Sequence, residues 1–271
     1  MRTLTSIRDM NGAEPFLTPG DAYVQSFARG LSVIRAFSSE RPAMTLSEVA
    51  AATGLTRAGA RRILLTLAQL GYVTAEGRQF RLTARILDLG FAYLSSMPFW
   101  NLAEPIMEAL VEEVHESSSA SVLDGTDIVY VLRVPTHKIM TISLGPGSRL
   151  PAWCTSMGRV LLSGLDDAEV DSILRRSKIE TRTLRTVTER AELRRLVAEV
   201  RVRGWALVNQ ELEEGLVSIS APIRERSGRV LAALNVSGQA NRTSPQQMVK
   251  RFLPPLRAAA DRLSELMRRR S

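Results

Sequence analysis

The sequence predicts an α+β protein with an N-terminal winged helix-turn-helix and a larger C-terminal domain of mixed α/β structure. Its 271 residues exceed one average domain and suit two, one small and one near the commonest domain size. Three helical patterns and one hairpin pattern are complete by Thr83. Beyond them, strand-like segments precede helices and further strands, an order that favours a mixed sheet over a doubly wound parallel one.

The N-terminal domain, expected over residues 24–83, begins with two helices. A flexible arm at 1–23 precedes it, because Thr, Ser, Asn, Gly and Pro mix there without period. Apolar residues then recur at helical spacing, and polar residues and Pro at 38–42 end the first helix. Residues 45–53 open with the capping-box pattern Thr-Leu-Ser-Glu, and Gly54 ends this second helix.

A third helix and a hairpin complete the domain. Residues 56–70 keep the helical period, and Gly71 ends the helix. Its inward-facing residues are expected to be Ile63, Leu64, Leu67 and Leu70. Two short extended runs about a Gly turn at 72–82 predict a β-hairpin wing. Residues 84–98 predict a linker helix that is apolar on more than one side, as a helix packed against a partner would be, and Pro98 marks its end.

The C-terminal domain, residues 99–271, shows extended and helical patterns. The dipeptide Asp-Gly at 124–125 is a strong hairpin signal. A last helix starts at Ser-Pro, residues 244–245, and paired prolines at 254–255 are expected to kink or split it. The other helices are predicted at 101–116, 155–162, 166–175 and 188–203, and the strands within 119–134 and at 139–144, 205–209, 216–224 and 230–237.

Composition excludes several classes of protein. No apolar run is long enough to cross a bilayer and the N-terminus lacks the apolar core of a signal peptide, so we expect a cytoplasmic protein with no membrane partner. A single cysteine, Cys154, excludes an internal disulfide. The two histidines, His115 and His137, have no Cys or His cluster around them, so neither a metal nor a cofactor is expected.

The net charge of +8 and the pI near 10.4 favour a polyanionic partner, because basic surface attracts phosphates. Arg supplies 33 of the 36 basic groups, a bias that genome base composition can also produce. The placement is more informative: residues 1–83 and 84–271 each carry a net charge of +4, although the first segment is less than half as long.

The third predicted helix carries the residues expected to bind DNA. A helix-turn-helix places the start of its second helix against base edges in the major groove, where Arg binds guanine bidentately and small residues allow close approach. The residues predicted to contact double-stranded DNA are Thr56, Arg57, Ala58, Ala60, Arg61 and Arg62 on this helix and Arg78 in the wing. Arg78 and Arg81 are expected to meet phosphate or solvent rather than bases. In the plainer interpretation, the helix is only a solvated basic face.

Residues 24–82, notably "TLSEVAAATGLTRAGARRILLTLAQLGYV", resemble the DNA-binding domain of the IclR family of bacterial regulators. The resemblance continues through "GSRLPAWCTSMGRVLL" at 147–162 and "NQELEEGLVSISAPI" at 209–223. It implies a GAF-like effector-binding domain at 99–271. The last two stretches look closest to the branch that regulates the β-ketoadipate pathway, whose effectors are protocatechuate or 4-hydroxybenzoate. An IclR-type regulator of another small organic acid remains the alternative.

The helix start at 155–158 is a candidate anion site, because unpaired backbone N–H groups point out of it. A simple helix cap by Thr155 or Ser156 explains the same residues equally well. The resemblance implies an effector carboxylate at this start and a pocket lined by Ser156, Met157, Ser218, Asn235 and Ser237, with Ile139, Ile142, Leu144 and Leu150 as an apolar wall. The serines and Asn235 also fit as backbone partners, and the aliphatic residues as core. Trp153 fits either ligand stacking or an interface.

An enzyme with Cys154 as nucleophile and His115 or His137 as base is an alternative that no local pattern supports. The sequence therefore predicts no enzyme. The acidic residues Glu211, Glu213 and Glu214 read as a solvated loop rather than as general acids.

The mechanism expected from these features is a homodimer whose two recognition helices read a roughly palindromic operator, while an effector shifts the arrangement of the DNA-binding domains. The resemblance implies that dimers can pair into tetramers. The rival of a different class is an architectural DNA binder without ligand control.

Overall fold

The structure is a computed structural model that describes residues 23–38, 40–96, 99–136 and 144–270. The chain divides into two compact units, with the boundary between Ser95 and Ser96. This boundary falls inside the predicted linker segment. None of the helices in the described ranges combines the length and apolar character needed to cross a membrane.

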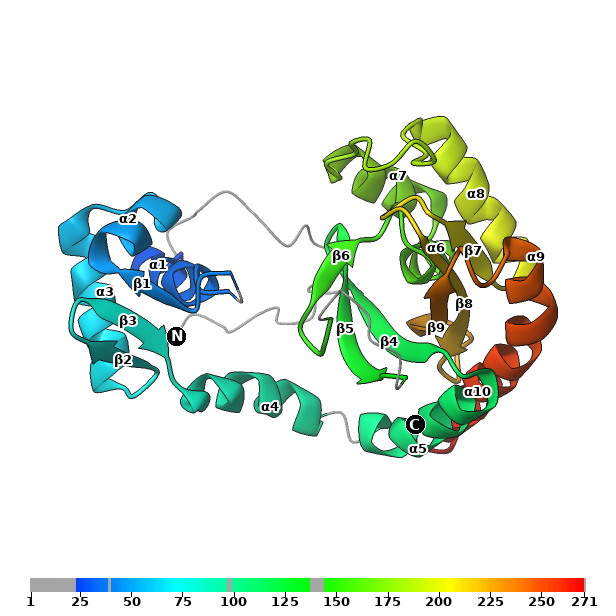
Figure 1. Cartoon of the computed structure of the whole chain (residues 1–271), viewed down its shortest axis with the longest axis horizontal. Coiled ribbons are helices and arrows are strands. Elements are labelled where there is room, and N and C mark those ends of the chain that lie inside the picture. The colour runs from blue at the N-terminus through cyan, green and yellow to red at the C-terminus, as the bar shows by residue number, and fades with distance from the viewer. Residues whose placement is uncertain (1–22, 39, 97–98, 137–143, 271) are drawn as a thin grey trace, which may run out of the picture. The chain divides into compact units, whose positions relative to one another are not determined.

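The N-terminal unit is a winged helix-turn-helix, as the sequence predicts (Figure 1). A third, short strand, β1, pairs with the wing hairpin and was not predicted from the sequence. The sheet order is β1-β3-β2, and both pairs are antiparallel. The elements are α1 (Gln25–Arg35), β1 (Ala43–Thr45), α2 (Leu46–Thr53), α3 (Arg57–Gln69), β2 (Val73–Glu76) and β3 (Gln79–Leu82).

Local signals fix the turn between the two helices of the motif. The capping box at the start of α2 is present: the backbone N–H of Thr45 donates to Glu48 at 2.7 Å, and the Glu48 N–H donates to the Thr45 hydroxyl at 3.4 Å. Gly54 has a φ of 67°, a left-handed conformation that glycine adopts without strain, and it ends α2. Both features confirm the predicted helix boundaries.

Val33, Val49, Leu64 and Leu67 form the centre of the apolar core of this unit. The prediction that Leu70 faces inward is wrong, because its side chain is 53% exposed. Leu70 lies one residue beyond α3, where the helical period no longer applies.

The linker segment forms a short turn η1 (Ala84–Ile86) followed by α4 (Leu87–Ser96). Leu87 and Phe91, one turn apart on α4, are both 69% exposed in the single chain. An apolar stripe of this kind is normally covered in an assembly.

The C-terminal unit is built on a six-stranded antiparallel sheet of order β6-β5-β4-β9-β8-β7. This confirms the predicted mixed domain and its hairpin at residues 124–125. The predicted strand at 139–144 falls almost wholly outside the described residues. The strands are β4 (Ser117–Asp124), β5 (Asp127–Val134), β6 (Arg149–Pro151), β7 (Ala206–Asn209), β8 (Leu216–Arg224) and β9 (Val230–Gln239).

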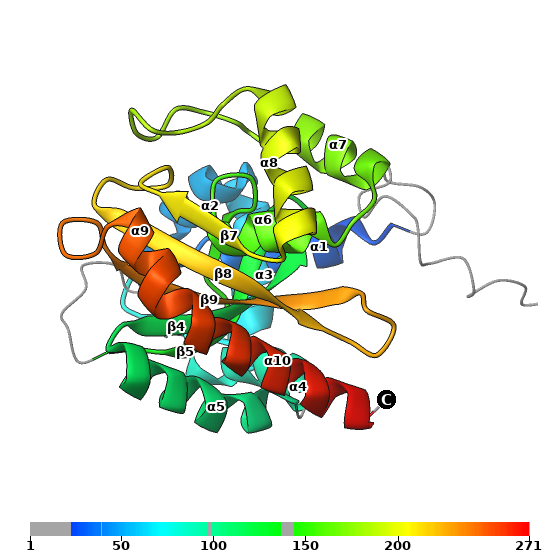
Figure 2. The ribbon, with the colours of Figure 1, turned by 90° about the vertical axis from the view of Figure 1, so that its right-hand side faces the viewer.

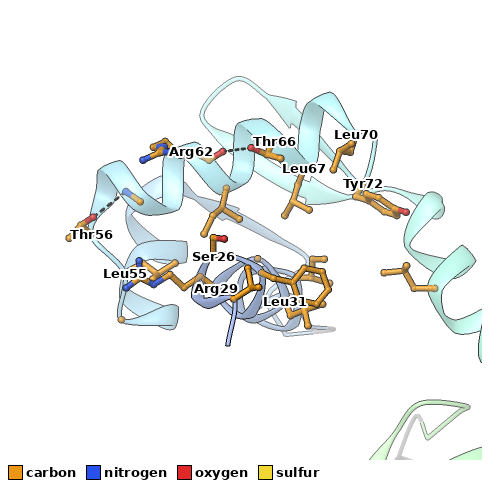
Figure 3. A pocket seen from close by; sticks show the side chains of 18 residues that line it. Ser26, Arg29, Leu31, Leu55, Thr56, Arg62, Thr66, Leu67, Leu70 and Tyr72 are labelled. Carbon is orange, nitrogen blue, oxygen red and sulfur yellow. Dashed lines mark hydrogen bonds between the residues drawn. The ribbon is translucent and has the colours of Figure 1, made fainter. Parts of the chain in front are cut away.

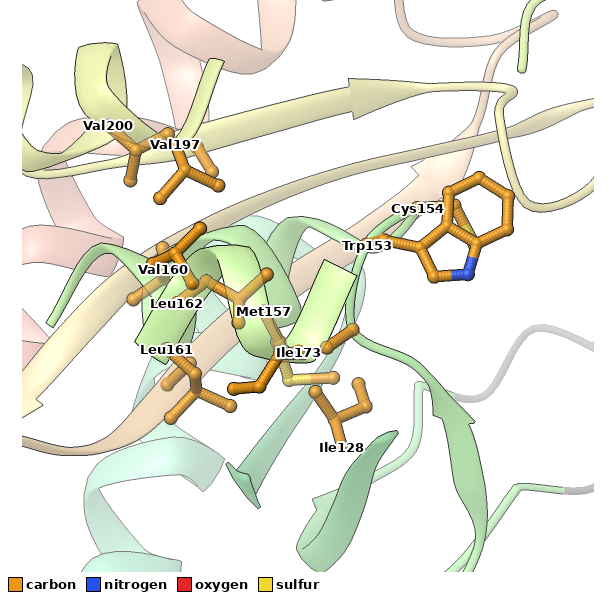
Figure 4. Close-up of a cluster of buried hydrophobic side chains, with 14 of the residues drawn as sticks. Ile128, Trp153, Cys154, Met157, Val160, Leu161, Leu162, Ile173, Val197 and Val200 are labelled. Carbon is orange, nitrogen blue, oxygen red and sulfur yellow. The ribbon is translucent and has the colours of Figure 1, made fainter. Parts of the chain in front are cut away.

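Helices cover both faces of this sheet (Figure 2). On one face α5 (Phe99–Val114) and α10 (Leu253–Arg270) lie side by side. On the other face α6 (Ser156–Ser163) packs on the central strands, and α8 (Arg190–Arg203) packs on α6 with α7 (Asp167–Arg176) beside it. Figure 4 shows the apolar side chains between α6, the sheet and these helices. All eight residues of α6 are buried.

The last helix is irregular where paired prolines are expected to disturb it. A short α9 (Pro245–Gln247) passes into a π-helical turn, η2 (Met248–Phe252), before α10 begins. The prolines at 254 and 255 lack the N–H groups that would bond back into this turn, so the wider turn absorbs the disruption.

Candidate functional site

The recognition helix α3 begins with a threonine cap and an exposed basic face. The Thr56 hydroxyl accepts the Gly59 N–H at 3.1 Å, which fixes the first turn. The predicted DNA-contacting residues that lie exposed on this helix are Thr56, Arg57, Ala58, Arg61 and Arg62. Ala60 is fully buried and packs in the core, which contradicts its predicted place in the contact surface.

The wing also presents arginines. Arg78 is exposed beside Gly77, whose φ of 61° makes the hairpin turn. Arg81 lies 3.6 Å from the Glu76 carboxylate on the paired strand, an exposed and therefore weak ion pair. Arg78 is placed as the prediction of a phosphate-contacting wing requires, and its role stays a prediction.

A cavity of about 250 Å³ opens on the α6 face of the C-terminal sheet. Of the nine predicted effector-site residues, seven line it: Leu144, Leu150, Ser156, Met157, Ser218, Asn235 and Ser237. The other two, Ile139 and Ile142, lie outside the described residues. The cavity is also lined by residues that the sequence analysis did not assign to it, namely Tyr130, Arg133, Thr155, Arg182, Leu212, Glu213 and Leu216.

Polar side chains of α6, β8 and β9 line this cavity and make hydrogen bonds within the protein. The Ser156 hydroxyl lies 2.8 Å from that of Ser218 and 2.7 Å from that of Ser220. On β9, the Asn235 amide donates to the Ser237 hydroxyl at 2.8 Å and accepts the Ser119 N–H at 2.9 Å. Asn235 is therefore partly occupied by the protein, as the plainer interpretation expected.

Helix α6 is held close to the chain that precedes it. The Thr155 hydroxyl accepts the Gly158 N–H and donates to the Pro151 carbonyl, both at 3.1 Å. A Cβ at Gly158 would overlap with the backbone of Ala152, so only glycine fits there. The contact places the start of α6, with Ser156 and Met157, at the cavity.

Two arginines and one glutamate are among the residues that line the cavity. Arg133 lies at the end of β5, Arg182 in the segment between α7 and α8, and Glu213 in the β7–β8 loop. The sequence alone does not single these residues out, because arginines and glutamates are spread throughout the chain. No local pattern distinguishes those that the fold brings to one cavity.

The β7–β8 loop contains a buried ion pair where a solvated acidic loop was predicted. Glu211 is 7% exposed, and Arg159 on α6 donates to both its oxygens at 2.8 and 2.6 Å. The prediction is wrong for this residue because its partner lies 52 residues earlier in the chain. Glu213 and Glu214 are exposed, as predicted.

Cys154 has the character of a core residue rather than of a nucleophile. It is fully buried, and burial raises the pKa of its thiol to about 12, an effect that the nearby charge of Arg182 opposes only in part. Trp153 is 1% exposed and belongs to the same apolar cluster (Figure 4). It is not among the residues that line the cavity. Within the described residues, no cluster of His, Cys, Asp and Glu suited to a metal ion is found.

The comparisons with known proteins cover both units. The family model described as "IclR helix-turn-helix domain" matches residues 26–77, and the one described as "Bacterial transcriptional regulator IclR C-terminal" matches residues 91–265.

Two curated relatives match over most of their length. The Pca regulon regulatory protein of Pseudomonas putida is 42% identical over 88% of this chain and 82% of its own. The p-hydroxybenzoate hydroxylase transcriptional activator of Acinetobacter baylyi is 34% identical over 90% of this chain and 92% of its own.

A solved structure has the same fold: an IclR homologue from Microbacterium hydrocarbonoxydans complexed with 4-hydroxybenzoate. It is 25% identical, covers 91% of this chain and 100% of its own, and superposes with a TM-score of 0.79.

Proposed function

We propose a function from one established premise: the chain belongs to the IclR family of bacterial transcriptional regulators. It is a regulator with a helix-turn-helix domain and not an enzyme. We propose that it controls genes of aromatic-acid catabolism and responds to a hydroxylated benzoate, with protocatechuate and 4-hydroxybenzoate as the leading candidates.

The observation that carries this proposal is the chemical mixture in the 250 Å³ cavity. Arg182 and the start of α6 offer positive charge and N–H donors to a carboxylate. Leu144, Leu150 and Tyr130 offer apolar surface to a ring. Ser218 and Ser237 offer hydroxyls to ring hydroxyl groups.

The relatives support the same class of ligand. The Acinetobacter baylyi relative is named as the transcriptional activator of p-hydroxybenzoate hydroxylase. The solved homologue is complexed with 4-hydroxybenzoate. The solved homologue shares its fold with this chain over 91% of the chain's length, which supports a ligand of the same class here.

Calorimetric titration of the full chain tests the proposal. Hydroxybenzoates should bind more tightly than benzoate, and benzoate more tightly than neutral benzyl alcohol, because each lost partner leaves a buried polar group unsatisfied at about 1 to 3 kcal/mol. Equal binding of the alcohol would contradict an anion site. Binding of glyoxylate or pyruvate without aromatic acids would redirect the proposal to another organic acid, and no ligand-induced shift with any acid would favour an architectural DNA binder.

We further propose that the chain binds its operator as a homodimer. In each chain Leu87 and Phe91 are exposed on α4. Phe27 and Leu31 on α1, and Val24 just before it, are exposed beside an apolar hollow (Figure 3). A second copy of the chain is the proposed occupant, because two recognition helices related by a two-fold axis match a palindromic site. Pairing of such dimers into tetramers is the next proposed level.

Sedimentation of wild-type protein and the Leu87→Asp variant tests the dimer. The variant should dissociate at concentrations where the wild type is dimeric, and its operator affinity should fall in parallel. Leu184→Asp is a matched control, because Leu184 is 98% exposed on the other unit. A monomeric wild type at micromolar concentration would contradict the dimer.

A further inference from the structure

The buried pair Arg159–Glu211 joins segments that are far apart in the chain. Arg159 is 3% exposed, and besides Glu211 it binds the Trp153 carbonyl through Nε at 3.3 Å. Two charges in a dry interior need complete partners, since either one alone is strongly destabilising. Arg159 donates one hydrogen bond to each oxygen of the Glu211 carboxylate, so each charge has its partner. This bidentate pairing also sets the orientation of the Glu211 side chain.

Glu211 in turn fixes the segment that carries Arg182. Its carboxylate accepts the Val187 N–H at 3.3 Å, and its backbone carbonyl accepts the Thr186 hydroxyl at 2.8 Å. The same Thr186 hydroxyl accepts the Arg182 N–H at 3.1 Å. A continuous path of hydrogen bonds therefore runs from α6 through Glu211 and Thr186 to the backbone of Arg182.

A second bond reinforces this arrangement. The Thr183 hydroxyl donates to the carbonyl of Gln210 at 2.6 Å. Gln210 has a φ of 61°, a conformation that a residue with a side chain keeps only when its surroundings hold it. The segment at 182–187 and the β7–β8 loop are thus fixed to each other, and both contribute side chains to the cavity.

We propose that Arg159 and Glu211 are positioning residues for the effector: they hold Arg182 where its guanidinium meets the effector carboxylate at the start of α6. The inference rests on the proposed function. The Arg182 side chain is 34% exposed, and its guanidinium lies 3.6 Å from the exposed Glu180 carboxylate, a weak contact that does little to fix its position. A long arginine side chain on an irregular segment otherwise loses its rotamer freedom when it binds, which weakens affinity.

The test compares a charged ligand with a neutral one of the same shape in the full chain. Calorimetry with 4-hydroxybenzoate and 4-hydroxybenzamide is applied to the wild type, Glu211→Gln and Arg182→Gln. Both variants should bind the acid about tenfold more weakly and the amide within about twofold of the wild type, since one charge-assisted contact is lost. Glu214→Gln, on the exposed part of the same loop, is the matched control and should change neither affinity.

The double variant Arg182→Gln/Glu211→Gln separates positioning from general stability. If Glu211 acts through Arg182, the double variant binds the acid no more weakly than Arg182→Gln alone. Full additivity, or equal loss of the acid and the amide in Glu211→Gln, would overturn the inference.

A milder variant tests the same link in case Glu211→Gln fails to fold. Thr186→Val keeps the shape and leaves the ion pair intact but breaks the link to Arg182, and it should weaken acid binding by about threefold without affecting the amide. A wild type that binds no aromatic acid would overturn the proposed function and this inference together. A wild type that binds the acid while Thr186→Val and Glu211→Gln bind it unchanged would overturn this inference alone.

Discussion

The helices at the two candidate sites, α3 and α6, start alike and lie in opposite surroundings. In each, a threonine hydroxyl accepts the N–H of a glycine three residues later, at 3.1 Å: Thr56 with Gly59, and Thr155 with Gly158. Yet α3 exposes Arg57 and Arg61, whereas α6 is buried along its whole length.

The difference teaches that a local cap decides where a helix begins but not what the helix does. The start of α3 meets solvent, so its arginines stay available to a large polyanion. Helix α6 packs against the sheet and α8, its arginine is paired internally, and the residues at its start line a cavity fit for a small molecule.

The largest effect is expected at Gly158, the glycine at the start of α6. Gly158→Ala should lower the free energy of unfolding of the C-terminal unit by about 3 kcal/mol, because its methyl group overlaps with the backbone of Ala152. Urea unfolding followed by tryptophan fluorescence measures this unit alone, since all three tryptophans lie in it.

The matched change in α3, Gly59→Ala, meets only the Thr56 hydroxyl at 3.1 Å. Because alanine has a higher helix propensity than glycine, the free energy of unfolding should change by no more than about 1 kcal/mol. Unfolding followed by circular dichroism measures this change. Similar losses of stability at both glycines would contradict the difference between the surroundings of the two helices.

The exposed arginines of α3 come next. Arg57→Ala or Arg61→Ala should weaken operator binding by about 1 to 3 kcal/mol and leave the melting temperature unchanged, because neither side chain is buried. Fluorescence anisotropy with operator and random DNA is the measurement. An equal loss of affinity for random DNA would mean that these residues contact only phosphates. No loss of affinity for either DNA would mean that α3 does not lie in the groove.

At the α6 cavity, Asn235→Ala should weaken hydroxybenzoates by about 1 to 2 kcal/mol and leave benzoate nearly unchanged, since Asn235 holds the Ser237 hydroxyl in place. Calorimetry of the variant with both ligands checks this. An equal effect on benzoate would mean that Asn235 supports the fold of the site and not the recognition of hydroxyls.

The smallest effects should come from the caps themselves. Thr56→Ala and Thr155→Ala each remove the side chain that caps the start of one helix. Each change should lower the free energy of unfolding by about 1 kcal/mol. The loss at Thr155 should be the larger of the two, because its buried hydroxyl also donates to Pro151. Thermal melts of the two variants decide the order, and a larger loss at Thr56 would contradict the contrast in burial.

Features encoded over a few neighbouring residues could be predicted from the sequence. The capping box at Thr45, the turn at Gly54 and the hairpin at residues 124–125 depend on contacts within one turn of chain. The winged helix-turn-helix and most strands follow from such signals. The inward face of α3 was predicted less well at its edges, where Ala60 is buried and Leu70 is exposed.

Features that depend on distant partners could not be predicted in this way. The family resemblance pointed to Ser156 and Ser218, which the fold brings together from positions 62 residues apart. Nothing near Glu211 in the sequence signals its burial, because Arg159 and the segment around Thr186 supply its partners. Arg182 reaches the cavity on an irregular segment that has no periodicity to read.

The bonds around Asn235 determine which way hydrogen atoms point at the cavity. The Ser119 N–H can only donate, so the oxygen of the Asn235 amide faces it and the nitrogen faces Ser237. The Ser237 hydroxyl is therefore an acceptor toward the protein and keeps its single hydrogen for a further partner. A methyl ether oxygen at the ring position beside Ser237 could accept that hydrogen as a ring hydroxyl would, so methylation of the ligand there should leave this bond intact.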